Sequence, residues 1–420
     1  MLEKTLPQQM ENSSNGTLRI FVVSTLGPIP VPNATVILSY NEEPENIIKT
    51  LTTDSSGQTT PVTLAAPPLE YSMIPNEPRP YSEYQVTVSA PGYETVVITG
   101  TEILPTQNAI LPVYMPPLEF PNEQKQDINI PEHTLYGIYP PKIPEPEIQP
   151  LPDTGEIVLS RVVIPEYIIV HDGVPSDSTA KDYYVTYKDY IKNVACCEIY
   201  STWPESCIYA NILAIMSFTL NRVFTEFYRS KGYSFTITSS TAYDQKWIYG
   251  RNIYENIDYL VDSVFNNYLS RPGVRQPLLT SYCDGNRTTC NGLSQWGSKF
   301  LGDDGYTAIE ILRYFYGDDI YINSATTVSG IPSSYPGYNL TEGSSGEKVR
   351  QIQTQLIRIA QNYPLIPVIT ADGIYGPNTA NAVKVFQSIF NLPQTGIVDF
   401  PTWYEISEIF VGVSRIAEPI

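Results

Sequence analysis

Apolar and polar residues alternate along the first quarter of the chain in the manner of β-strands. β-Branched runs at 18–23 and 34–38, and an alternating run at 84–88, end at turn-forming stretches such as 27–28, 54–57 and 91–92. A period of two, interrupted by Gly, Pro, Asn and Asp, is typical of short antiparallel strands. We therefore predict a β-sandwich over residues 17–116, preceded by a disordered tail at 1–16.

Residues 117–160 break this alternation. Pro144 and Pro146 are interleaved with Glu145 and Glu147, and further prolines precede and follow them. Proline removes a backbone donor and fixes φ, so such a run continues neither a helix nor a central strand. We predict an extended, acidic linker. It serves either as a spacer or as a segment that a protease cuts to activate the protein.

Helical spacing dominates the rest of the chain. Apolar residues recur at helical intervals over 204–228, 255–269 and 307–316, with a strand-like stretch at 233–249. This mixture predicts an α+β domain at 161–325. After a connector at 326–342, residues 343–414 predict three helices separated by glycine turns, where glycine supplies a positive φ. The predicted fold class is therefore multidomain α+β.

Composition restricts the partners. The 420 residues carry a net charge of −19, which argues against nucleic acid because no basic stripe is available to neutralise phosphates. No apolar run reaches membrane-spanning length, and residues 1–17 lack a secretory pattern. Five cysteines, an odd number, favour free thiols over a disulfide framework. The two histidines, His133 and His171, leave little basis for histidine catalysis.

Two motifs point to chemistry. Residues 190–198 (YIKNVACCE), followed by Trp203 and Pro204, and residues 291–297 (NGLSQWG) resemble the catalytic domain of the stage II sporulation protein D family, lytic enzymes of peptidoglycan. The resemblance implies that Glu198, at the head of a helix, is the catalytic acid of a lytic transglycosylase. An apolar setting favours the protonated form of a carboxyl, which suits this role. The substrate-binding residues that it implies are Trp203, Tyr243, Gln245, Tyr282, Ser294 and Gln295.

The flanking domains carry resemblances of their own. The order of strands and turns in 17–116 is similar to transthyretin-like sandwiches, and residues 343–414 resemble the three-helix peptidoglycan-binding module. In this order, the domains resemble clostridial spore cortex-lytic enzymes. That resemblance implies a germination-specific enzyme acting on cortex peptidoglycan in the cortex or coat region of the spore. It also implies a monomer and a zymogen whose sandwich is a prodomain, activated by a protease that cuts the linker.

Departures from the family keep other hypotheses open. Met216-Ser217-Phe218 stands where the family has Arg-Thr-Tyr, and Asn291 falls where a Gly-His pair is usual. The protein could instead bind cortex or coat peptidoglycan without cleaving it. A hydrolysing muramidase is the third hypothesis, and it needs a second carboxylate, for which the candidates are Asp244 and Asp284.

The cysteines raise the question of a metal. Cys283 and Cys290 could ligate zinc, form a disulfide or remain free thiols. Two thiolates do not complete a tetrahedral site, so we expect no cofactor, with zinc as the alternative. Cys196 and Cys197 are better read as small core residues than as nucleophiles.

Overall fold

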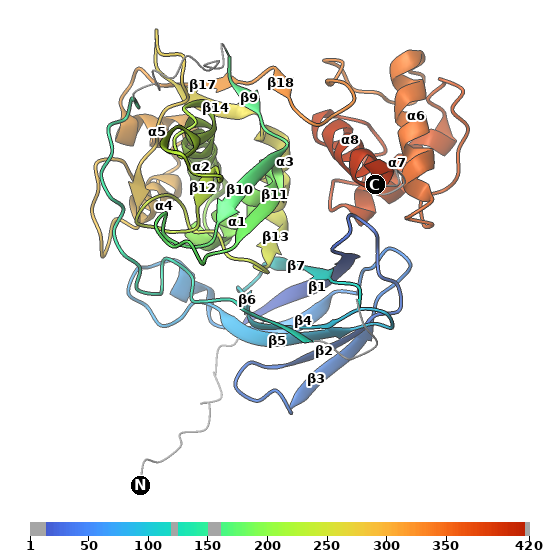
Figure 1. Ribbon diagram of the computed structural model, residues 1–420, viewed down its shortest axis with the longest axis horizontal. Helices are drawn as coiled ribbons and strands as arrows, with labels where there is room; N and C mark the ends of the chain where they lie inside the picture. Colours follow the sequence, from blue (N-terminus) through green and yellow to red (C-terminus); the bar gives the residue numbers. More distant parts are fainter. Residues whose placement is uncertain (1–13, 119–124, 150–160, 416–420) are drawn as a thin grey trace.

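Two β-sheets packed face to face form the N-terminal part of the protein (Figure 1). The computed structural model describes residues 14–118, 125–149 and 161–415. One sheet has the order β13-β7-β1-β4 and the other the order β3-β2-β5-β6-β8. The strands are β1 (Ser14–Ser24), β2 (Thr35–Tyr40), β3 (Ile47–Thr52), β4 (Val62–Ala66), β5 (Ser82–Ser89), β6 (Thr95–Ile103), β7 (Asn108–Met115), β8 (Lys125–Asn129) and β13 (Ile253–Tyr254).

Apolar residues at every second position of the strands form the core of this sandwich. Leu18, Ile20 and Val22 of β1 are fully buried, as are Val86 and Val88 of β5, while the residues between them are more exposed. Successive side chains of a strand point to opposite faces, so this pattern places one face against the opposing sheet. The predicted strands are present, and the first begins at Ser14, three residues before the predicted boundary.

The predicted linker is less uniform than its sequence suggests. Its residues Lys125–Asn129 form β8, which pairs in parallel with β6 at the edge of the sandwich. Residues 130–149, which contain much of the proline-rich run, have no helix or strand and cross the surface of the central domain. We call residues 130–149 the strap. The remaining parts of the predicted linker at 119–124 and 150–160 and most of the predicted tail, 1–13, lie outside the described residues.

Among the described residues, the central domain combines five α-helices and one short 3-10 helix (Arg229–Lys231) with short strands. β10 pairs with β11 and β12, β14 with β17, β15 with β16, and β18 with β9. The helices are α1 (Tyr187–Glu198), α2 (Glu205–Phe224), α3 (Glu255–Val264), α4 (Gln295–Asp303) and α5 (Ala308–Tyr316). The strands are β9 (Val163–Ile164), β10 (Tyr167–His171), β11 (Asp182–Thr186), β12 (Ile237–Thr238), β14 (Asn267–Ser270), β15 (Tyr282–Cys283), β16 (Leu293–Ser294), β17 (Tyr321–Ser324) and β18 (Thr327–Val328).

Two sequence predictions are corrected here. The helix expected over 255–269 stops at Val264, and Asn267–Ser270 forms β14 instead. Two adjacent asparagines, Asn266 and Asn267, are weak helix formers at this point. The strand-like stretch 233–249 contains only the two-residue strand β12. Mixed α+β, multidomain architecture is confirmed.

Helix α2 is the centre of this domain. It is long and apolar enough to cross a membrane by length and composition, yet 89% of its most apolar window is buried inside the protein. Its contacts with α4, α5 and β14 account for this burial. The prediction that no apolar run reaches membrane-spanning length is therefore wrong for α2, and its burial identifies it as a core helix.

Within the described part of the C-terminal domain there are three helices, as predicted: α6 (Glu347–Ala360), α7 (Pro377–Ile389) and α8 (Phe400–Arg415). Two glycine turns connect them, and each is braced by a buried glutamine. Gln353 accepts the N–H of Gly373, and Gln387 accepts the N–H of Gly396, both at 2.8 Å. Both glycines have positive φ, which explains why the turns need them.

Buried polar contacts fix the three parts against one another. Arg251, just before β13, forms an ion pair with Glu102 of β6, and each residue is only 1% exposed. Strand β13 itself extends a sheet of the sandwich by pairing with β7. On the other side, Lys188 of α1 pairs with Glu405 and Glu408 of α8. The sandwich is thus a packed partner of the central domain rather than a freely tethered module.

Candidate functional site

Glu198 lies at the end of a helix, not at its head as predicted. It is the last residue of α1, and α2 begins seven positions later, at Glu205. Its Oε1 accepts the backbone N–H of Lys246 at 2.9 Å, and its Oε2 accepts the Nε2–H of Gln295 at 3.1 Å. The residue is only 5% exposed. Two N–H donors from different segments therefore fix the carboxylate in one orientation.

The strap forms the opposite wall of this site. A cavity of about 250 Å³ is lined by Glu198, Gln295 and other residues of the central domain and by strap residues Thr134 and 138–142. Thr134 of the strap donates its hydroxyl to the carbonyl of Cys197 at 2.7 Å and reaches Glu198 Oε2 at 3.5 Å. Binding sites for small ligands usually measure about 300–1,000 Å³, so little room remains beside Glu198 for a polymer.

Lys142 is the strap residue whose charged group packs against aromatic rings of the central domain. Its Nζ donates to the carbonyl of Asp244 and lies 4.4 Å from the ring centroids of both Phe218 and Tyr282. Burial lowers the pKa of Lys142 to about 8, although the nearby Glu198 carboxylate acts in the opposite direction. A cation over two aromatic faces is a favourable contact when water is excluded.

A disulfide-closed loop holds the strap from the other side. Arg287 donates to the carbonyls of Thr134, Tyr136 and Gly137, at 2.7, 2.9 and 2.5 Å. Cys283 and Cys290 form a disulfide around this loop, which corrects the expectation of free thiols. Their Cα atoms are 6.1 Å apart, within the range for a disulfide.

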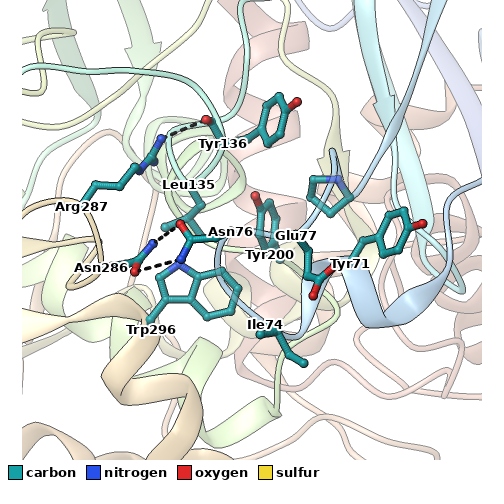
Figure 2. A pocket seen from close by; sticks show the side chains of 11 residues that line it. Tyr71, Ile74, Asn76, Glu77, Leu135, Tyr136, Tyr200, Asn286, Arg287 and Trp296 are labelled. Atoms are coloured by element: carbon teal, nitrogen blue, oxygen red, sulfur yellow. Dashed lines mark hydrogen bonds between the residues drawn. The ribbon is translucent and has the colours of Figure 1, made fainter.

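A second, smaller cavity lies next to this loop. It measures about 120 Å³ and is lined by the sandwich, the strap and the central domain together (Figure 2). Asn76 of the sandwich and Asn286 of the loop hydrogen-bond to each other across it, and Arg287 reaches the carbonyl of Tyr136. The sandwich and the central domain thus meet at the strap around this cavity.

The predicted substrate-binding residues differ in whether they line the cavity. Tyr282 and Gln295 line the cavity with Glu198, and Ser294 caps α4 by accepting the N–H of Gly297 at 2.9 Å. Trp203 donates instead to the carbonyl of Ser72 in the sandwich at 2.8 Å.

The remaining two predicted residues, Gln245 and Tyr243, make their contacts elsewhere in the central domain. Gln245 is fully buried and hydrogen-bonds to Tyr190 and Thr219. Tyr243 contributes its carbonyl to Arg222 at 3.2 Å. Neither is among the residues that line the cavity.

The two candidate second carboxylates also differ. Asp244 is fully buried and bonded to Arg222, Tyr228 and Thr238. Asp284 lines the cavity. Burial disfavours its charge, but hydrogen bonds from Thr288 and Arg287 outweigh this effect and hold the pKa of Asp284 below its usual value. Asp284 is therefore an anion beside Glu198.

Several contributors to the site could not be predicted from the motifs. A backbone N–H such as that of Lys246 leaves no pattern in the sequence, Thr134 and Lys142 lie in the predicted linker, and no role was predicted for Arg287. Within 14–118, 125–149 and 161–415, no group of three or more His, Cys, Asp or Glu side chains is arranged to hold a metal ion. Cys196, Cys197 and Cys207 are buried free thiols, consistent with core packing.

Comparisons with known proteins address the C-terminal domain most directly. Residues 345–406 match the family model described as "Putative peptidoglycan binding domain". A stretch of 71 residues, 17% of this chain, is 44% identical to the zinc D-Ala-D-Ala carboxypeptidase of Streptomyces albus G. That stretch spans only 26% of the Streptomyces protein.

Solved structures give weaker likenesses. The Bacillus anthracis TIE protein has 19% identity and a TM-score of 0.16, covering 28% of this chain and 16% of that one. Catechol 1,2-dioxygenase from Acinetobacter sp. ADP1 has 14% identity and a TM-score of 0.18, covering 29% of this chain and 60% of that one. Likenesses this low assign neither fold nor activity. The matches to residues 345–406 and to the Streptomyces enzyme support a cell-wall-related protein with a peptidoglycan-binding domain.

Proposed function

We propose that the protein is a lytic transglycosylase that cleaves spore cortex peptidoglycan during germination, of the type found in clostridial spore cortex-lytic enzymes (SleC). It is stored in the cortex or coat region as a monomeric zymogen, and a protease activates it by cutting within residues 117–160. One observation carries the catalytic part. The carboxyl group of Glu198 lies on a cavity wall, fixed by Lys246 and Gln295, in a chain that also carries a peptidoglycan-binding domain.

A single carboxyl group suffices for this reaction. Glu198 gives its proton to the glycosidic oxygen as the bond from that oxygen to the muramyl C1 breaks. The muramyl 6-hydroxyl then attacks C1, its proton passes to the Glu198 carboxylate, and a 1,6-anhydro end forms. No water is consumed, and Glu198 regains its starting form.

A hydrolysing muramidase is the second candidate, and Asp284 is the observation that favours it. This carboxylate lines the same cavity as Glu198, and its hydrogen bonds hold it ionised. A second carboxylate could activate water, as in glycosidases that use two. Non-catalytic peptidoglycan binding remains the third candidate.

One experiment separates the three. Purified cortex is digested with linker-cut protein, and the muropeptides are identified by mass spectrometry, with the Glu198→Gln variant as control. Anhydro-muramyl ends that depend on Glu198 support the transglycosylase. Reducing muramyl ends instead indicate the muramidase, and the absence of products from a protein that binds cortex indicates a binding protein.

A further inference from the structure

The strap is held along its length, by the sandwich at its start and by the central domain further on. At its start, the N–H of Ile130 donates to Thr99 of the sandwich, and at its end Gln149 exchanges hydrogen bonds with Gln276 in both directions, each at 3.1 Å. Between these ends lie the Arg287 contacts and the inserted Lys142. A chain segment held at so many points is a bound ligand of the central domain rather than a spacer.

Two acidic residues of the strap each form an ion pair with an arginine of the central domain. Glu145 accepts two N–H bonds from Arg222, whose side chain is fully buried, while Glu145 is 19% exposed. Glu147 pairs similarly with Arg271, which is 20% exposed. Paired N–H bonds from one guanidinium recognise the geometry of a carboxylate specifically.

Arg222 needs this partner because of its surroundings. Its Nε donates to Asp244 at 2.7 Å, but its two terminal nitrogens depend on Glu145 and on the carbonyl of Tyr243. The guanidinium also lies 3.8 Å from the ring centroid of Phe227, in apolar surroundings. When the strap leaves, these nitrogens lose their carboxylate, and leaving such donors without an acceptor is costly.

We propose that the strap is a pseudosubstrate bound in cis, and that Arg222, which is linked to the Glu198 cavity through Asp244 and Lys142, is a carboxylate subsite filled by Glu145 until the strap leaves. The ligand that replaces Glu145 is a carboxylate on the peptide side chains of peptidoglycan. This inference rests on the proposed function for the identity of the polymer, and it specifies what blocks Glu198: the strap, not the sandwich. A cut in the chain between the strap and the central domain frees the C-terminal end of the strap. Glu147 and Glu145, which lie near that end, can then dissociate from Arg271 and Arg222.

The test uses the full chain with Glu198→Gln, so that nothing is cleaved while binding is measured. Glu145→Gln is compared with Glu132→Gln, which makes the same change of charge in the same strap but has no ion pair among the described residues. The probe is a soluble peptidoglycan fragment with free peptide carboxylates, alongside the same fragment after amidation. The C-terminal domain is identical in all variants, so its contribution cancels.

In the uncut protein we expect Glu145→Gln to tighten binding of the free-carboxylate fragment about tenfold, because a charge-assisted contact of the closed strap is lost. Glu132→Gln is expected to behave as the parent protein. After the linker is cut, with Glu145 unchanged, the amidated fragment should bind at least about fivefold more weakly than the free one. Equal binding by Glu145→Gln and Glu132→Gln overturns the pseudosubstrate assignment. Equal binding of the two fragments by the cut protein overturns the carboxylate subsite.

Hydrogen exchange of residues 132–149 provides a readout that loss of fold would not imitate. Faster exchange confined to the strap in Glu145→Gln supports the proposal, whereas faster exchange across α2 would mean general destabilisation and would overturn it. The separate cortex digestion keeps the two hypotheses apart. If linker-cut protein with an intact Glu198 yields no muropeptides while these binding results hold, the catalytic proposal fails and the strap assignment stands.

Discussion

Replacing Glu102 by Gln is expected to destabilise the central domain, although Glu102 belongs to the sandwich. The change leaves the positive charge of Arg251 buried, with the carbonyl of Cys196 at 2.7 Å as its remaining backbone acceptor. Removing one partner of a buried ion pair costs about 3–5 kcal/mol, and an amide oxygen that keeps one hydrogen bond places the cost near the lower end. That is a large part of the ~5–15 kcal/mol by which a domain is stable.

The chain offers a closely matched control. Glu83 of β5 lies directly opposite Glu102 of β6 in the strand ladder, but it pairs with Arg79, which is 39% exposed. Because exposed pairs contribute ~0–1 kcal/mol, Glu83→Gln should leave stability nearly unchanged. A double variant, Glu102→Leu with Arg251→Met, should recover much of the loss, since it removes both charges.

Urea unfolding measures the effect. Tryptophan fluorescence reports mainly the central domain, through Trp203, Trp247 and Trp296, with Trp403 of the C-terminal domain contributing as well, whereas far-UV circular dichroism reports the helices and strands of all domains together. We expect the fluorescence midpoint of Glu102→Gln to fall by about 1 M, taking a slope near 3 kcal/mol per M. If Glu102→Gln and Glu83→Gln shift it equally, or if only the circular dichroism changes, the buried pair does not couple the two domains.

Three further changes test the site. Glu198→Gln should reduce cortex lysis at least about a hundredfold without reducing retention on insoluble peptidoglycan, because it removes the acid and keeps the shape; residual lysis within tenfold of wild type contradicts this role. The pKa of Lys142 is about 8 while the strap is closed, below the usual 10.4 of a lysine exposed to water, so between pH 8 and 10 the strap takes up a proton when it opens. A rise in pH over this window should therefore stabilise the closed state of the strap. The ratio of uncut to cut activity should fall over that window, and Lys142→Met should abolish the fall. Cys283→Ser opens the loop that carries Arg287 and should speed hydrogen exchange of the strap at least about fivefold, with unchanged exchange as the contrary result.

Much of the fold was accessible from local pattern. Strands with a period of two and glycine turns that need a positive φ are local properties, so the sandwich and the three C-terminal helices could be predicted. Helix α1 was missed although its signals are present. Tyr187, Tyr190, Ile191 and Val194 follow helical spacing, and Thr186 caps the helix by accepting the N–H of Asp189. Reading that pattern would have placed Glu198 at the end of a helix.

The strap could not be predicted in the same way. Its contacts join side chains to distant backbone groups, as between Arg287 and Thr134, and such contacts leave no period in the sequence. Proline-rich chain is extended whether it is free or bound, so the pattern around Glu145 does not distinguish a spacer from a ligand. The disulfide could not be predicted either, because a separation of seven residues between two cysteines permits a bond but does not require one.

These contacts decide how inhibition must be tested. A chain truncated before residue 162 loses the strap, but it also loses Glu102 beneath Arg251, the carbonyl of Ser72 that Trp203 needs, and the strand β7 that pairs with β13. Inactivity of such a fragment would follow equally from misfolding or from the absence of catalysis. A chain cut within residues 150–160 keeps every described contact of the sandwich and frees only one end of the strap. The cut, two-chain protein is therefore the form in which release of Glu198 can be separated from loss of the domain that supports it.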